Sequence, residues 1–120
     1  MSQPPKIDPL APAAQRDTAL TMDSAGLVIE WSDDAEAIFG WSSADAIGRR
    51  LSELIIPERL RSMHEAGLKR FMAGGPGTVL NRAIEIAAID RDGREFTVEV
   101  HITPEKTAHE LRFATSVRKL

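Results

Sequence analysis

The sequence has no cysteine among its 120 residues. Disulfide bridges, thiolate zinc sites and cysteine nucleophiles are therefore excluded. The chain also lacks any apolar run near the roughly 20 residues that cross a bilayer. Residues 1–15 lack the basic and apolar regions of a signal peptide. These absences predict a cytoplasmic protein with no membrane partner.

Basic residues are also fewer than acidic residues. The chain carries 15 Lys and Arg residues against 18 Asp and Glu residues, for a formal net charge of −3. Proteins that bind nucleic acids usually present a basic face. The basic residues of segment 58–70 alternate with Glu58 and Glu65, which indicates a solvated helix face. We therefore expect no nucleic-acid partner.

No catalytic constellation stands out in the sequence. The neighbouring carboxylates Asp33 and Asp34 begin a predicted helix, and none of the acidic residues has a His, Ser or Lys partner at a catalytic spacing. The glycine-rich segment 74–77 lacks the Lys-Ser/Thr of a phosphate-binding loop. His101 and His109 are interpreted as solvated surface histidines. The chain is therefore predicted not to be an enzyme.

Hydrophobic periodicity predicts one α+β domain. Residues 1–16 contain four prolines and are expected to form a flexible or partly helical arm, whereas residues 17–120 form the domain. Alternating and helical patterns predict strands at 18–22, 27–31, 79–89, 95–103 and 111–117, short helices at 35–39, 44–47 and 51–55, and a longer helix at 58–72. This order favours an antiparallel sheet with helices on one face and a small-molecule pocket between the layers.

Four segments of the chain resemble conserved pieces of PAS domains. They are Asp23–Trp31, Ala35–Trp41, Ala46–Arg49 and Asp92–Val100, in the family's order and at natural spacing. The resemblance implies a five-stranded antiparallel sheet with short helices and one longer helix packed on one face. It also implies sensing of a ligand or of redox state, and dimerisation.

The same resemblance implies a sensory or interaction module of a larger bacterial signal-transduction protein, such as a two-component system. The expected partners are a second copy of the chain and a downstream effector, such as a histidine kinase or a cyclic-dinucleotide enzyme. Two positions depart from the family pattern. Ser32 replaces the asparagine that often opens the first helix, and Lys119–Leu120 replaces the usual end of the last strand, through natural divergence or a cloning scar.

The predicted ligand site lies between the long helix and the sheet. The helix stripe places His64 one turn after Leu60, on the side that faces the interior. A one-residue shift in strand register would invert the sheet assignments. The residues expected to line the site are His64, Met63, Leu68 and Phe71 on the helix, and Ile84, Ile86, Val98 and Val100 on the sheet.

Haem is one cofactor that the resemblance raises. Segment 57–65 is similar to the helix that carries the proximal histidine in haem-binding oxygen-sensor PAS domains, so His64 would be a metal ligand only if haem is bound. The arginine expected in the following strand is replaced by Ile84, with Arg82 two residues earlier. A packed histidine is the favoured interpretation of His64. The missing cysteine excludes the two covalent light-sensing modes of the family.

A ligand-free homodimerisation module is the alternative. Its interior would be filled by Met63, Leu68, Phe71 and Phe96, and residues 9–19 or the outer sheet face would hold the partner. Two further questions stay open in the sequence. Trp31 fits either the core or an exposed sheet face, and Glu36 and Arg49 fit either an ion pair or two solvated charges.

Overall fold

The structure is a computed structural model that describes residues 18–77 and 79–120. The predicted arm, residues 1–16, lies outside the described residues. The elements in chain order are β1 (Thr18–Asp23), β2 (Val28–Trp31), α2 (Asp33–Phe39), α3 (Ser43–Ala46), α4 (Leu51–Ile55), α5 (Glu58–Met72), β3 (Ala83–Ile89), β4 (Glu95–Lys106) and β5 (Leu111–Lys119).

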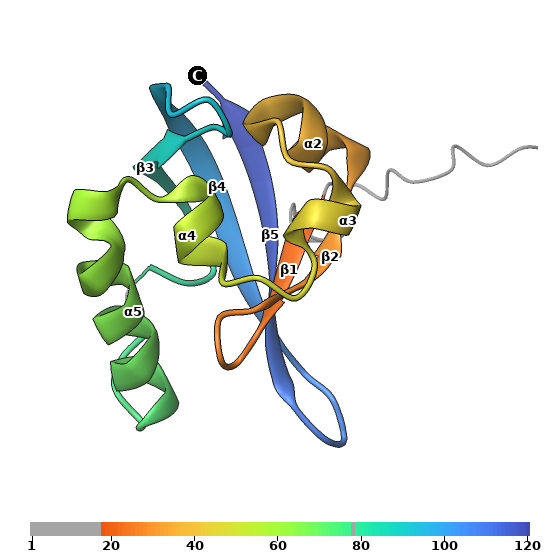
Figure 1. Cartoon of the computed structure of the whole chain (residues 1–120). Helices are drawn as coiled ribbons and strands as arrows, with labels where there is room; N and C mark the ends of the chain where they lie inside the picture. The colour runs from red at the N-terminus through yellow and green to blue at the C-terminus, as the bar shows by residue number, and fades with distance from the viewer. Residues whose placement is uncertain (1–17, 78) are drawn as a thin grey trace, which may run out of the picture.

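The five strands form one antiparallel sheet in the order β2-β1-β5-β4-β3. The helices lie together on one face of this sheet, and the β4–β5 hairpin reaches beyond the other strands (Figure 1). The α+β fold class predicted from the sequence is confirmed.

Local side-chain chemistry explains the start of the fold. The Asp23 carboxylate accepts hydrogen bonds from the backbone N–H groups of Ala25 and Leu27, both at 2.9 Å, and so closes the β1–β2 turn. Ser32 caps α2, because its hydroxyl accepts from the backbone N–H of Ala35 at 3.2 Å. Gly40 then ends the helix with a φ of 82°, in the left-handed region that favours glycine.

Two predicted boundaries in the second half of the chain are wrong. β3 starts at Ala83 rather than at residue 79, because Asn81 adopts a φ of 62° and its N–H donates to the Ile102 carbonyl. β4 continues to Lys106, three residues beyond its predicted end at residue 103. Pro104 is tolerated there because β3 begins opposite His101, so this part of β4 has only β5 as a neighbour.

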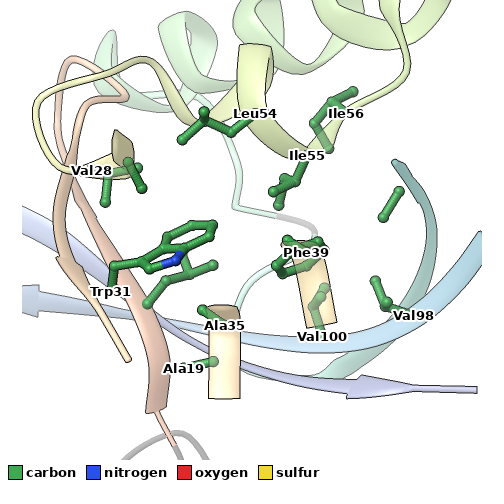
Figure 2. Packing of buried hydrophobic residues seen from close by; sticks show 13 residues of the cluster. Ala19, Val28, Trp31, Ala35, Phe39, Leu54, Ile55, Ile56, Val98 and Val100 are labelled. Carbon is green, nitrogen blue, oxygen red and sulfur yellow. The ribbon is translucent and has the colours of Figure 1, made fainter. Parts of the chain in front are cut away.

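The main core joins the helical layer to the sheet around Phe39. The Phe39 side chain is fully buried and lies near Trp31 in the packed interior (Figure 2). Its ring centroid lies 5.9 Å from that of Trp31 and 6.1 Å from that of Phe96. Aromatic contacts of this kind add to the free energy gained from burial. The other fully or nearly fully buried apolar residues of the main core are Ala19, Leu20, Val28, Ala35, Ala46, Leu54, Ile55, Ile56, Ala88, Val98 and Val100.

Two tryptophans connect β2 to α4 through hydrogen bonds. The indole N–H of Trp31 donates to the Trp41 carbonyl at 2.8 Å, and the indole N–H of Trp41 donates to the Leu54 carbonyl at 3.1 Å. Trp31 is 7% exposed and belongs to the main core, which answers the question left open by the sequence. The relay of two indoles therefore fixes α4 above the sheet edge.

Replacing Phe39 by alanine should lower the free energy of unfolding by about 3 to 5 kcal/mol, because the substitution leaves a cavity in the centre of the main core. The matched substitution Phe71→Ala, at a half-buried ring on α5, should cost only about 1 to 2 kcal/mol. Urea denaturation followed by circular dichroism measures both values. Equal losses of unfolding free energy in the two variants would show that the Phe39 ring contributes no more to the packing than the Phe71 ring.

Candidate ligand site between helix α5 and the sheet

Helix α5 packs less tightly than the rest of the domain. It begins after Pro57 and runs for 15 residues, with the apolar side chains Leu60, Leu68 and Phe71 on the stripe that His64 shares. None of its residues is fully buried, and its main neighbour is α4. Elements with few buried contacts open at low free-energy cost.

The first half of α5 is held on α4 by polar contacts. The Arg61 guanidinium donates to the carbonyl groups of Ser52 and Ile56, at 3.1 and 2.9 Å, and so caps the end of α4. The Ser52 hydroxyl donates to the Glu65 carboxylate at 2.7 Å, and Arg50 lies 3.6 Å from the same carboxylate. The Ser52 hydrogen bond is the main reason why the pKa of Glu65 is lowered.

An ion pair also ties the start of α5 to the sheet. The two terminal nitrogens of Arg59 donate to the two carboxylate oxygens of Glu95, at 2.8 and 2.6 Å. This bidentate contact raises the pKa of Arg59 and lowers that of Glu95, chiefly through the hydrogen bonds. Both side chains are exposed, so the contact fixes geometry more than it stabilises the fold.

The second half of α5 takes part in a separate apolar centre. The Phe71 ring meets the Phe113 ring of β5 edge-on, with centroids 5.8 Å apart. Phe71 and Leu80 both lie so close to Gly77 that a Cβ there would clash with them, and Leu68 lies against Gly26 in the β1–β2 turn. We call Leu68, Phe71, Leu80 and Phe113 the second apolar centre; it is not part of the main core.

His64 lies at the junction of these two apolar regions. One turn before it, Leu60 packs against the main core, and one turn after it, Leu68 belongs to the second apolar centre. Burial lowers the pKa of His64, so its imidazole is neutral at pH 7. A neutral imidazole offers one hydrogen-bond donor and one acceptor, or a nitrogen ligand for a metal.

The four predicted residues of the sheet come together on its inner face. Ile84 pairs with Val100 and Ile86 pairs with Val98 across β3 and β4. The two valines are fully buried in the main core, whereas the two isoleucines stay partly exposed beside it. Side chains of the main core therefore cover the inner face of the sheet at Val98 and Val100, and they cover it less completely at β3.

Met63 lies on the exposed side of α5, although the sequence pattern suggested that it lines the ligand site. Its side chain is 60% exposed, because residue 63 points about 100° around the helix from the stripe position 64. This corrects its place among the residues expected to line the site. His64, Leu68 and Phe71 remain on the half-buried side of α5.

Several features of this region were missed by the sequence reasoning. Phe113 shares a sheet face with Val117 at the two-residue period of β5, so the sequence pattern could have placed it inward. The polar contacts of Arg61 and Glu65 join neighbouring helices and leave no periodic signal. A surface hollow of about 280 Å³ was also missed. It lies at the β1–β2 edge, is lined by residues 18–20 and 30–32, and contains none of the predicted site residues.

Two further features of the described residues bear on function. Within residues 18–77 and 79–120, no three His, Asp or Glu side chains gather in a way that could hold a metal ion. In the same part of the chain, every helix is too short or too polar to span a membrane.

Comparison with known proteins decides the family. Residues 13–113 match the family described as PAS fold. The chain belongs to the PAS fold family. It is 28% identical over 104 residues to the Sensor protein FixL of Bradyrhizobium diazoefficiens, a match that covers 87% of this chain and 20% of that protein. The chain spans only 14% and 20% of the length of two curated relatives that it matches.

Solved PAS structures share the fold at low sequence identity. The PAS domain of a Colwellia psychrerythraea protein superimposes with a TM-score of 0.67 and 18% identity, over 84% of this chain and 83% of that chain. The PAS domain of the Cronobacter turicensis RpfR quorum-sensing receptor, in complex with C12:0, gives a TM-score of 0.66 at 16% identity, over 92% and 98% of the two chains. These likenesses show the PAS fold, and PAS domains are generally sensory rather than catalytic.

Burial of His64 predicts a pH-dependent stability of the PAS domain. The imidazole of the unfolded chain has an ordinary pKa near 6.5, and the folded value is lower. The unfolded state therefore binds more protons near and below pH 6.5, and the free energy of unfolding falls as the pH is lowered from neutral through this ordinary value. Urea denaturation across this range should show a shallower slope for His64→Gln than for the parent.

His109→Gln serves as the matched control, because His109 lies on the exposed β4–β5 turn. This variant should keep the parent slope. An unchanged slope in His64→Gln would show that His64 is not held in its neutral form by the fold.

Proposed function

We propose that this PAS domain is the sensory module of a larger signal-transduction protein, and that it binds a small, mainly apolar ligand between α5 and the sheet. The observation that carries the proposal is the position of His64. It supplies one polar group at the junction of two apolar regions, on a helix with no fully buried residue. Small-molecule sites typically combine an apolar lining with a few placed polar groups.

A route for the signal follows from the contacts of α5. A ligand that enters beside Leu68 and Phe71 changes the contact of Phe71 with Phe113. Phe113 lies on β5, the strand that ends the domain at Lys119. A ligand that prefers one arrangement of this contact shifts the population of β5 conformations toward it. The effector, such as a histidine kinase or a cyclic-dinucleotide enzyme, would respond to that shift in β5 either directly or through a second copy of the chain.

Haem fits this site only in part. The neutral imidazole of His64 is of the type that ligates haem iron. Two turns further along α5, however, the Phe71 ring packs against that of Phe113, with centroids 5.8 Å apart. A porphyrin placed between this part of α5 and the sheet would have to displace this pair, so we propose a smaller ligand. The C12:0 bound by the RpfR receptor is a suitable probe, because it is a narrow apolar molecule with one polar end.

One observation favours a second candidate function, a ligand-free homodimerisation module. The rings of Phe71 and Phe113 already contact one another, and Phe71 and Leu80 both lie close to Gly77, so this part of the interior is partly filled. Phe96 does not contribute to this filling, because it stacks on Phe39 in the main core. A binding measurement separates this candidate from the ligand-binding function.

Filling the proposed site should abolish binding. Leu68→Trp adds bulk on the half-buried side of α5, and Met63→Trp makes the same change at an exposed position of the same helix. We expect dodecanoic acid to raise the melting temperature of the parent and of Met63→Trp. Leu68→Trp should show no shift, or a Kd weakened by about tenfold or more. Calorimetric titration and thermal melting provide the measurements.

Equal binding by all three proteins would place the ligand elsewhere on the domain. Absence of binding in the parent, both with dodecanoic acid and with haemin followed by its visible absorption, would favour the homodimerisation module. A sharp haemin spectrum that is lost in His64→Ala would instead identify a haem site, and would show that the Phe71–Phe113 contact opens.

A further inference from the structure

Two arginines flank the ring of Trp41 at the surface of the helical layer. The guanidinium carbons of Arg49 and Arg91 lie 4.9 and 5.5 Å from the ring centroid. Both side chains are exposed, and within the described residues neither guanidinium takes part in an ion pair. Five other arginines do pair with carboxylates: Arg50, Arg59, Arg94, Arg112 and Arg118.

The backbone holds this arginine–tryptophan stack in place. The Arg49 carbonyl accepts from the N–H of Val28 at 2.9 Å, and the Arg91 N–H donates to the Phe39 carbonyl at 2.8 Å. The Trp41 ring is fixed by its own hydrogen bond to α4. Side chains ordered before binding lose less entropy when a partner arrives. Tryptophan and arginine are also the residue types that most often dominate the binding energy of protein interfaces.

Helix α2 carries the complementary charge at its other end. Asp33, Asp34 and Glu36 are exposed, and within the described residues they form no ion pair. Asp33 and Gly40 are about 10 Å apart along the helix axis. Arg91 packs beside Gly40, where an added Cβ would lie 3.3 Å from the Arg91 Cβ. The outward side of α2 is therefore acidic at its start and basic at its end.

We propose that the outward side of α2, together with Arg49 and Arg91, is the interface for a second copy of the chain. A two-fold axis that sets the two α2 helices antiparallel brings the acidic end of each copy to the arginines of the other. Ala37 is exposed between the two ends, and its small side chain allows close approach. This inference rests on the self-association part of the proposed function and does not require a ligand.

Charge reversal tests this surface through two variants of the full chain. The acid variant carries Asp33→Lys and Asp34→Lys, and the arginine variant carries Arg49→Glu and Arg91→Glu. Each variant alone places like charges opposite one another, so its dimer should dissociate about tenfold or more readily than the parent dimer. An equimolar mixture places opposite charges together at both contacts, so association should return. Sedimentation velocity at low salt measures the three samples, and added salt should weaken the parent dimer.

Recovery in the mixture supports the interface and shows that both variants are folded. Glu99→Lys is the matched control, because Glu99 pairs with Arg118 at the β4–β5 ladder, away from α2. This control should associate like the parent. If every variant dimerises as well as the parent does, this interface is wrong and the dimer forms through another face. A parent that stays monomeric at every concentration would overturn the self-association part of the proposed function as well.

Discussion

The relay of two indole hydrogen bonds, from Trp31 to the Trp41 carbonyl and from Trp41 to the Leu54 carbonyl, is the constraint on which the rest of the structure depends. It fixes α4 relative to β2 and encloses the fully buried ring of Phe39. Buried donors that lose their partner cost about 1 to 3 kcal/mol each, so the relay also specifies one arrangement of the helical layer. The capping of α4 by Arg61 then sets the position of α5.

The domain therefore consists of a tightly packed part and a loosely packed part that share one sheet. The main core gives stability, whereas α5 is tied by polar contacts at its start and by the Phe71–Phe113 contact near its end. The proposed sensory function needs such a division, because a ligand can shift only an element whose alternative positions differ by a small free energy. His64 lies where the two parts meet, and in the proposed site it would provide the polar contact to a ligand.

The sequence was sufficient for most of the fold and for part of the site. Hydrophobic period located the four helices of the described residues, and the alternation in β4 correctly placed Val98 and Val100 inward. The start of β3 was misplaced because Val79 and Leu80 are apolar without being in a strand. The exposure of Met63 follows from its position about 100° around the helix from His64, which the helical period could have indicated. The second apolar centre, by contrast, is formed by contacts of α5 with distant segments of the chain, and local periodicity carries no information about such contacts.

The most direct test of a loosely held α5 is amide hydrogen exchange of the ligand-free domain. Amides in the second half of α5, after His64, should exchange far faster than those of β5 beside Phe113 or of α2. Exchange within the first half of α5 should be intermediate, because Arg61 and Glu65 hold it to α4. Protection of the whole of α5 at the level of the β4–β5 strands would show instead that the helix is part of a single rigid core.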